Sequence, residues 1–220
     1  YSVVHLGTPC RTWSRARQPA LRNSVRFLLS GFPGLSARRL SLVREGNELL
    51  RRSLVILNFA CAVGAGVTIE NPESSLLWHH PGILRWLRDW DCKRITTHYC
   101  RFGCAYIKPT SIAGNIYGLE RLEKHCTRDH VHEILRGKDI YGHWKTEKAA
   151  MYPRLLCALW AEVVDEDFSI RVSSEDSCYS IPEQTTPHQL RCRDDRFQSL
   201  PLSVVENCDY KTMFVHKWLK

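Results

Sequence analysis

The sequence lacks the long apolar run that would anchor the chain in a membrane. Its uncharged run 53–69 has only 17 residues and is interrupted by Asn58, Gly64 and Gly66. A membrane-spanning helix needs about 20 predominantly apolar residues. We interpret the run as a buried helix that leads into a core strand, and we expect no membrane partner.

The chain has ten cysteines but no Cys-x-x-Cys pair and no compact extracellular spacing. This pattern favours a reducing nucleus or cytosol over a disulfide framework. Four residues of zinc-binding type crowd within eight positions, namely His125, Cys126, His130 and His132. Because they lack regular ligand spacing, we assign no metal to the chain and keep zinc binding as the open alternative.

Residues 1–52 contain no lysine and no aspartate, and they carry ten arginines against two glutamates. Their net charge of +8 equals that of the whole chain, so the remaining residues are neutral as a group. A basic segment of this kind is expected in a protein that binds a polyanion such as DNA. Arginine-rich disorder is the alternative interpretation.

The stretch Gly7-Thr8-Pro9-Cys10-Arg11-Thr12-Trp13-Ser14 is a candidate catalytic turn. Pro9 fixes its own φ and biases Thr8 toward an extended conformation, so a strand can end sharply here. Cys10 would then lie at a loop tip, near cationic side chains that favour the thiolate and attract phosphate, namely Arg11, Arg15 and Arg17. A small buried cysteine is the structural alternative.

A carboxylate follows on a separate turn, Ile69-Glu70-Asn71-Pro72. The β-branched residues 67–69 follow a Gly-Ala-Gly break, which predicts a short buried strand with Glu70 at its carboxyl end. Ligands bind at this end of the strands in open α/β sheets. A helix cap or half of an ion pair is the alternative for Glu70.

The two turns together resemble the catalytic motifs of the DNA (cytosine-5)-methyltransferases. The family's nucleophile loop, Pro-Cys-x-x-x-Ser, is matched by Pro9, Cys10 and Ser14. Its second turn, Glu-Asn-Val, is matched by Glu70 and Asn71, with Pro72 in place of valine. The longer patterns around both turns are similar to a divergent branch of the family, and the resemblance covers about residues 3–164.

This resemblance implies a mechanism of methyl transfer to DNA. The Cys10 thiolate would add to carbon 6 of a flipped-out cytosine while Glu70 holds or protonates ring nitrogen 3. Carbon 5 then becomes nucleophilic toward the methyl group of S-adenosylmethionine, and Asn71 would position the Glu70 turn. The resemblance also implies substrate contacts from the nucleophile loop, by Pro9, Arg11, Ser14, Arg15 and Arg17. Arg11 stands where many family members have glutamine.

A third segment, 99–110, is similar to the family motif in which a cationic residue reaches the cytosine carbonyl. Lys108 is the candidate for this role, although the usual pattern is Gln-x-Arg-x-Arg and lysine lacks the bidentate arginine fork. A solvated loop charge is the alternative for Lys108. The segment 145–161 resembles the branch's closing segment, and its leucines at helical spacing predict a structural helix packed on the sheet.

The chain lacks the family's cofactor motif, which is a strand and a Gly-rich turn that bind S-adenosylmethionine. No such fingerprint precedes Tyr1, and the absence of glycine from 162–220 argues against a circular permutation. We therefore expect the catalytic half of a longer protein, a truncated reading frame or a decayed element. The cofactor-binding residues stay unknown.

The predicted elements give an α/β fold class, specifically a partial Rossmann-like S-adenosylmethionine-dependent methyltransferase fold with a mobile C-terminal tail. We expect strands over 1–6, 67–70 and 94–99, and a helix from near Ser41 to about residue 64.

The predicted catalytic region spans 1–166. It contains an arginine-rich loop over 11–52 and a small recognition insert over 111–144. The tail 167–220 shows no sustained period and is expected to be irregular.

We predict a DNA cytosine-5 methyltransferase-like protein of the nucleus or cytoplasm. One alternative is a non-catalytic nucleic-acid-binding module that keeps the fold. Another is a thiol enzyme unrelated to methyl transfer, which needs a histidine paired with Cys10. His5 is the nearby candidate.

Overall fold

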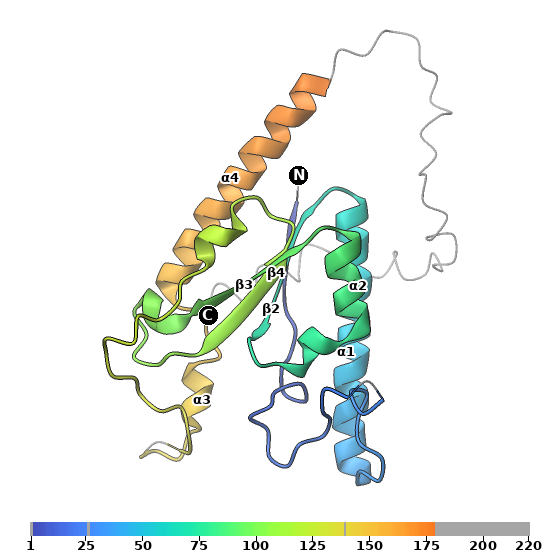
Figure 1. The fold of residues 1–220 in the computed structure, drawn as a ribbon, viewed down its shortest axis with the longest axis vertical. Coiled ribbons are helices and arrows are strands. Elements are labelled where there is room, and N and C mark those ends of the chain that lie inside the picture. Colours follow the sequence, from blue (N-terminus) through green and yellow to red (C-terminus); the bar gives the residue numbers. More distant parts are fainter. Residues whose placement is uncertain (1, 26, 139, 179–220) are drawn as a thin grey trace. The chain divides into compact units, whose positions relative to one another are not determined.

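The computed structural model describes residues 2–25, 27–138 and 140–178, so most of the predicted tail lies outside the described residues. The described part is a mixed α/β fold around a four-stranded sheet (Figure 1). The strands are β1 (Val3–Gly7), β2 (Gly66–Pro72), β3 (Lys93–His98) and β4 (Pro109–Gly114), and their order across the sheet is β1-β2-β4-β3.

β1 and β2 form a parallel pair whose connection contains the helix α1 (Ala37–Ala62). Parallel strands need a crossover of this kind, and a helix is its usual form. α1 ends just before Gly64, whose φ of +75° is a conformation that favours glycine. β4 runs antiparallel to both β2 and β3, so the sheet is mixed.

Helices cover both faces of the sheet (Figure 1). α1 and α2 (Pro81–Asp89) pack on one face, in a hydrophobic cluster that includes Trp86. α4 (Arg154–Cys178) packs on the other face, in a second cluster that includes Trp160. The remaining elements are short, namely η1 (Leu76–His79), η2 (Tyr99–Phe102), η3 (Leu119–Leu122) and α3 (Lys145–Lys148).

Alternation along the strands sorts their side chains between the two faces. On β2, Val67 and Ile69 belong to the cluster on the α1 side. Glu70 occupies an alternate position and therefore faces the α4 side. On β1, His5 also faces this side, and its ring centroid lies 4.5 Å from that of Trp160. The strand that carries Glu70 to the sheet edge thus also directs its carboxylate toward the layer of α4.

Two predicted boundaries near the site differ from the structure. The arginine-rich loop 11–52 is shorter than predicted, because its residues from Ala37 onward belong to α1. The recognition insert 111–144 also begins too early, because residues 111–114 lie in β4, between β2 and β3. Small and polar residues in this strand hide the apolar pattern by which a central strand is predicted.

The predicted irregular tail does not begin at residue 167, since α4 continues to Cys178. Asp167 is only 1% exposed, and its carboxylate accepts hydrogen bonds from the Tyr117 backbone N–H (2.8 Å) and from Arg171 Nε (3.0 Å). These buried contacts anchor α4 in a region where the sequence no longer has apolar residues at helical spacing. Residues 179–220 lie outside the described part.

The uncharged run 53–69 is divided between α1 and β2. Within the described residues, no helix combines the length and the apolar character that crossing a membrane requires.

Candidate active site at the ends of β1 and β2

The carboxyl ends of β1 and β2 lie side by side. In the parallel register Gly7 is the partner of Glu70, and Cys10 follows Gly7 by three residues. The two turns singled out in the sequence therefore leave the sheet at the same edge, where ligands bind in open α/β sheets.

Two hydrogen bonds join these turns. The side chain of Asn71 is fully buried, and its Nδ2 donates to the carbonyl oxygens of Thr8 (2.7 Å) and Glu70 (3.0 Å). The backbone N–H of Leu76 donates to the carbonyl oxygen of Trp13 (2.8 Å). Asn71 thus bridges the start of the nucleophile loop and the strand that carries the carboxylate.

Cys10 lies in a tight turn at the beginning of the loop. Its carbonyl oxygen accepts the backbone N–H groups of Trp13 (2.9 Å) and Ser14 (2.8 Å). The residue is half-buried and belongs to neither hydrophobic cluster, while Pro9 before it is exposed. The structural alternative of a fully buried apolar cysteine therefore does not describe Cys10.

A buried arginine anchors the rest of the loop. Trp13 is 1% exposed, and the guanidinium carbon of Arg22 lies 3.6 Å from the centroid of its ring. Arg22 Nη2 donates to Thr12 Oγ1 (3.0 Å), and its Nη1 donates to Asn47 Oδ1 (2.7 Å). Burial lowers the pKa of the Arg22 guanidinium to about 10, so the group stays charged at neutral pH. The loop that presents Cys10 is therefore a packed structure.

Glu70 lies at the end of a chain of hydrogen bonds on the α4 side. The Tyr152 hydroxyl donates to Glu70 Oε2 (3.0 Å) and also contacts His5 Nε2 (3.1 Å), while His5 Nδ1 lies 3.0 Å from Thr68 Oγ1. A tyrosine hydroxyl has one proton, so donation to Glu70 assigns the Nε2–H tautomer to His5 and makes Thr68 the donor to Nδ1.

The Tyr152 hydroxyl stays protonated in this setting. Burial, and then the negative charge of Glu70, raises the pKa of Tyr152 above its ordinary value. Glu70 itself is only 8% exposed, and a buried carboxylate is costly unless hydrogen bonds compensate it. Tyr152 supplies such a bond, so it is a positioning residue for Glu70.

Lys108 contacts Tyr99, and the Tyr99 hydroxyl in turn interacts electrostatically with Glu70. Lys108 Nζ donates to the carbonyl oxygen of Ala149 (2.8 Å) and to the Tyr99 hydroxyl (3.2 Å). Burial, and then the charge of Glu70, raises the pKa of Tyr99. Lys108 is half-buried, so the alternative of a solvated loop charge does not describe it.

The remaining predicted substrate contacts in the nucleophile loop differ in exposure. Arg11 and Arg15 are exposed, and Arg17 and Ser14 are half-buried. Arg15 Nη2 lies 3.4 Å from His79 Nε2 at the end of η1.

Sequence reasoning missed Tyr152, His5, Tyr99 and Arg22 as parts of the site. Tyr152 was assigned to a closing segment of structural role, and His5 was considered only as a partner of Cys10. The alternation of side chains along β1 and β2 was the available signal, because it puts His5 and Glu70 on one face once the strands are parallel neighbours.

The described residues do not fit the cofactor that the resemblance implies. Residues 1–44 contain no aspartate or glutamate, so the turn after β1 offers no carboxylate to hold ribose hydroxyls. Within the described part, β1 pairs with β2 alone, and its other edge has no partner strand. We therefore derive no chemical step through S-adenosylmethionine.

Comparisons of the chain with protein-family models, with curated proteins and with solved structures find no match. Any function assigned to the chain rests on its residues and their geometry.

Gly46 tests the packing of the loop against α1. A Cβ at this position would overlap Thr12 Oγ1 and approach Arg22 Nη2. Replacing glycine by alanine inside an exposed helix normally stabilises by roughly 1 kcal/mol. We expect Gly46→Ala instead to lower the free energy of unfolding by about 1–3 kcal/mol in urea titrations, because the site is overpacked. Ser41→Ala, at an exposed position of α1, is the control. A gain in stability for Gly46→Ala would contradict this packing.

Asn71 tests the bridge between the turns. Asn71→Asp replaces a donor by a charged acceptor that faces two carbonyl oxygens, and we expect it to cost about 3 kcal/mol near neutral pH. Burial beside these carbonyls raises the pKa of the introduced carboxyl, so the native state binds the proton more tightly and the cost shrinks as pH falls. Urea unfolding at several pH values measures both effects.

Ser74→Asp is the matched control for this variant, since it adds the same charge at an exposed position of the same turn. An equal, pH-independent effect of both substitutions would show that Asn71 does not bridge the turns.

Proposed function

We propose that this chain is the base-attacking part of a DNA cytosine-5 methyltransferase-like enzyme of partial Rossmann-like fold. The observation that carries the proposal is the pairing of Gly7 with Glu70, fixed by the hydrogen bond from Asn71 to Thr8. This pairing supports the convergence of the Cys10 turn and the Glu70 carboxylate on one substrate. The parallel β1-α1-β2 unit supports the Rossmann-like part of the fold.

The chemistry begins with attack on the ring. The Cys10 thiolate forms a bond to carbon 6 of an extruded cytosine, and the π electron pair of the 5,6 double bond shifts to carbon 5 and, through carbon 4, toward nitrogen 3. Glu70 supplies a proton or a hydrogen bond at nitrogen 3, which neutralises the developing charge and leaves carbon 5 nucleophilic. Carbon 5 then takes up an electrophile, which is a solvent deuteron when no methyl donor is bound, and loss of its original proton with departure of the thiolate restores the aromatic ring. In the full reaction that the resemblance implies, the electrophile would be the methyl group of S-adenosylmethionine, for which the described residues offer no fitting site.

Neighbouring side chains hold the Glu70 carboxyl group and the extruded cytosine in place. Tyr152 donates to Glu70 Oε2 and so fixes the orientation of the carboxyl group. We assign Lys108 to the cytosine carbonyl, since it is the cation of the polar group that contains Tyr99 and Glu70. Pro9 and Ser14 belong to the loop that faces the extruded base.

DNA binding would use only part of the arginine-rich arm. Arg22 is buried, and Arg51 and Arg52 form ion pairs with Glu48 (each 2.8 Å). The exposed cations of the described arm outside these ion pairs are Arg11, Arg15, Arg38, Arg39 and Arg44. Two of these flank the Cys10 turn, where a phosphate backbone would lie if the base enters the site.

A non-catalytic nucleic-acid-binding module is the second candidate. The lack of acidic residues over 1–44 favours it, because the described chain then has the basic loop without a cofactor site. A thiol enzyme built on Cys10 and His5 has less support, since the His5 ring nitrogens bond to Tyr152 and Thr68.

Hydrogen exchange at carbon 5 tests the proposed chemistry without the cofactor. Reversible addition of Cys10 makes carbon 5 basic, so we expect the chain to exchange this hydrogen for deuterium in heavy water, read by mass spectrometry of the recovered DNA. Cys10→Ser should abolish the exchange, and Glu70→Gln should slow it about 100-fold or more, the scale of general acid catalysis.

Cys157→Ser is the matched control, because burial raises the pKa of this thiol and makes it a poor nucleophile. Exchange that survives Cys10→Ser would rule out the assigned nucleophile. DNA binding by the wild-type chain without any exchange would select the non-catalytic module.

The salt dependence of DNA binding tests the assignment of the cations. We expect Arg11→Ala and Arg15→Ala each to reduce the slope of log K against log salt by about 1, because each removes one phosphate contact. Arg52→Ala is the control, since this residue pairs with Glu48 and leaves the loop unchanged. Equal changes in all three slopes, measured by fluorescence anisotropy, would contradict a role for the loop.

A further inference from the structure

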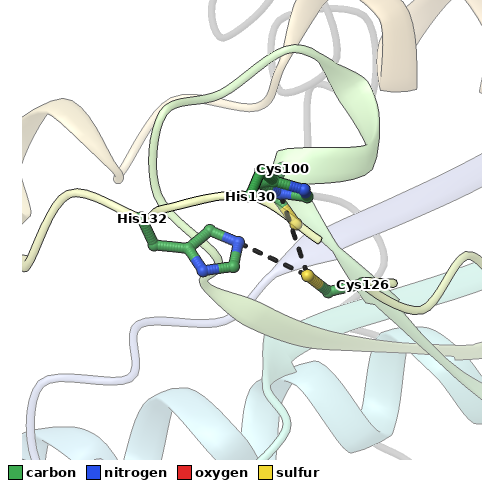
Figure 2. Close-up of side chains that lie close together, drawn as sticks. All are labelled: Cys100, Cys126, His130 and His132. Atoms are coloured by element: carbon green, nitrogen blue, oxygen red, sulfur yellow. Dashed lines mark hydrogen bonds between the residues drawn. The ribbon is translucent and has the colours of Figure 1, made fainter. Parts of the chain in front are cut away.

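Four side chains of metal-binding type converge outside the candidate active site. Cys100 comes from η2, and the others come from one segment that follows η3, namely Cys126, His130 and His132. Their ligand atoms all lie within 4.8 Å of one another. Figure 2 shows both histidine rings directed toward the sulfur of Cys126, with Cys100 beside them.

The two distances from the Cys126 sulfur to the histidine nitrogens match those between ligands around one tetrahedral ion. Zinc binds thiolate sulfur at about 2.3 Å and imidazole nitrogen at about 2.0–2.1 Å, which puts a sulfur and a nitrogen about 3.6 Å apart in a tetrahedron. The Cys126 sulfur lies 3.4 Å from His132 Nε2 and 3.8 Å from His130 Nε2. One ion fits among these atoms after small side-chain movements.

Neighbouring groups prepare the ligands for a cation. His130 Nδ1 donates to Asp129 Oδ1 (2.7 Å), which leaves Nε2 with the lone pair that faces Cys126. A carboxylate on the second nitrogen of a histidine is the usual outer partner of a zinc ligand. The backbone N–H of Arg128 donates to the Cys126 sulfur (3.2 Å), and Arg128 adopts a φ of +62° to do so.

We infer that Cys100, Cys126, His130 and His132 bind one zinc ion in a closed, structural site. Two thiolates and two imidazoles in tetrahedral arrangement are a ligand set that zinc prefers. Four protein ligands leave no open position for a substrate, so the ion holds structure and does no chemistry. This inference stands independently of the proposed function.

The site would fasten a segment that has little core of its own. Residues 123–136 contain no helix or strand, and Val131 and Ile134 in this segment are 96% and 74% exposed. The zinc ion would join the segment to η2 directly after β3. Binding energy from the metal then replaces the hydrophobic burial that usually orders a chain of this length.

The structure changes the ligand set that the sequence suggested. His125 lies outside the cluster, since its Nε2 bonds to Glu123 Oε1 (3.1 Å) and its ring packs on His98. Cys100, 26 residues before Cys126, takes its place. The set suggested by the sequence contains His125, and the set in the structure contains Cys100 instead. Substitution of these two residues therefore distinguishes the two sets.

Metal analysis of the full chain tests the inference. The protein is purified under reducing conditions with zinc and then dialysed, and we expect one zinc ion per chain by elemental mass spectrometry. Replacement by cobalt should give the visible bands of a tetrahedral ion and a thiolate charge-transfer band in the near ultraviolet. A wild-type chain that retains no zinc, or iron in its place, overturns the inference.

Substitutions then identify the ligands. Cys100→Ser and Cys126→Ser should each lower the charge-transfer band to about half or less, because one of two thiolates is lost. His125→Asn and Cys104→Ser are the controls and should leave the spectrum unchanged. A spectrum that depends on His125 but not on Cys100 would refute this ligand set. A Cys100–Cys126 disulfide in the reduced preparation, seen as a loss of two hydrogens in intact mass, would also refute it.

Discussion

The parallel pairing of β1 with β2 is the constraint on which the candidate site depends. It brings together two turns that are 60 residues apart in sequence, because Gly7 and Glu70 are partners in the register. Closing a loop of this length costs conformational entropy, and α1 offsets that cost by burying one side of the crossover against the sheet. Beyond the last paired residues of β1 and β2, where the hydrogen bonds between these two strands stop, Asn71 joins the two turns through its hydrogen bond to Thr8.

The sheet separates two environments that serve the site differently. On the α1 side, Trp13 inserts into the hydrophobic cluster and Arg22 packs on its ring, so the loop is held by burial. On the α4 side, Glu70 is held by a chain of hydrogen bonds that runs through Tyr152 and His5 to Thr68. Alternation of side chains along β1 and β2 accounts for the polar anchor of the acid, whereas the apolar anchor of the nucleophile loop comes from burial of a residue beyond the end of β1.

Local signals in the sequence predicted most strands and both turns, since a β-branched run or a Pro-Cys turn acts within a few residues. They did not predict contacts made at long range. Tyr152 contacts Glu70 across 82 residues, and the middle of α4 is anchored by the hydrogen bond from the Tyr117 backbone to Asp167. β4 escaped prediction because its sequence, Pro-Thr-Ser-Ile-Ala-Gly, has small and polar residues that pack well only between two neighbouring strands.

The single turn of η2 connects the two sites. Tyr99 points from this turn to Lys108 and, through its charge interaction, to Glu70, while the adjacent Cys100 points to the histidine cluster. Consecutive residues on a 3₁₀ turn face different directions, so one turn serves both sites without sharing a side chain. An ion at the proposed zinc site would hold the sulfur of Cys100 and thereby also the backbone that carries Tyr99. The residues of η2 thus contribute a side chain to each site, with the Tyr99 hydroxyl bonded to Lys108 and the Cys100 sulfur beside the histidines.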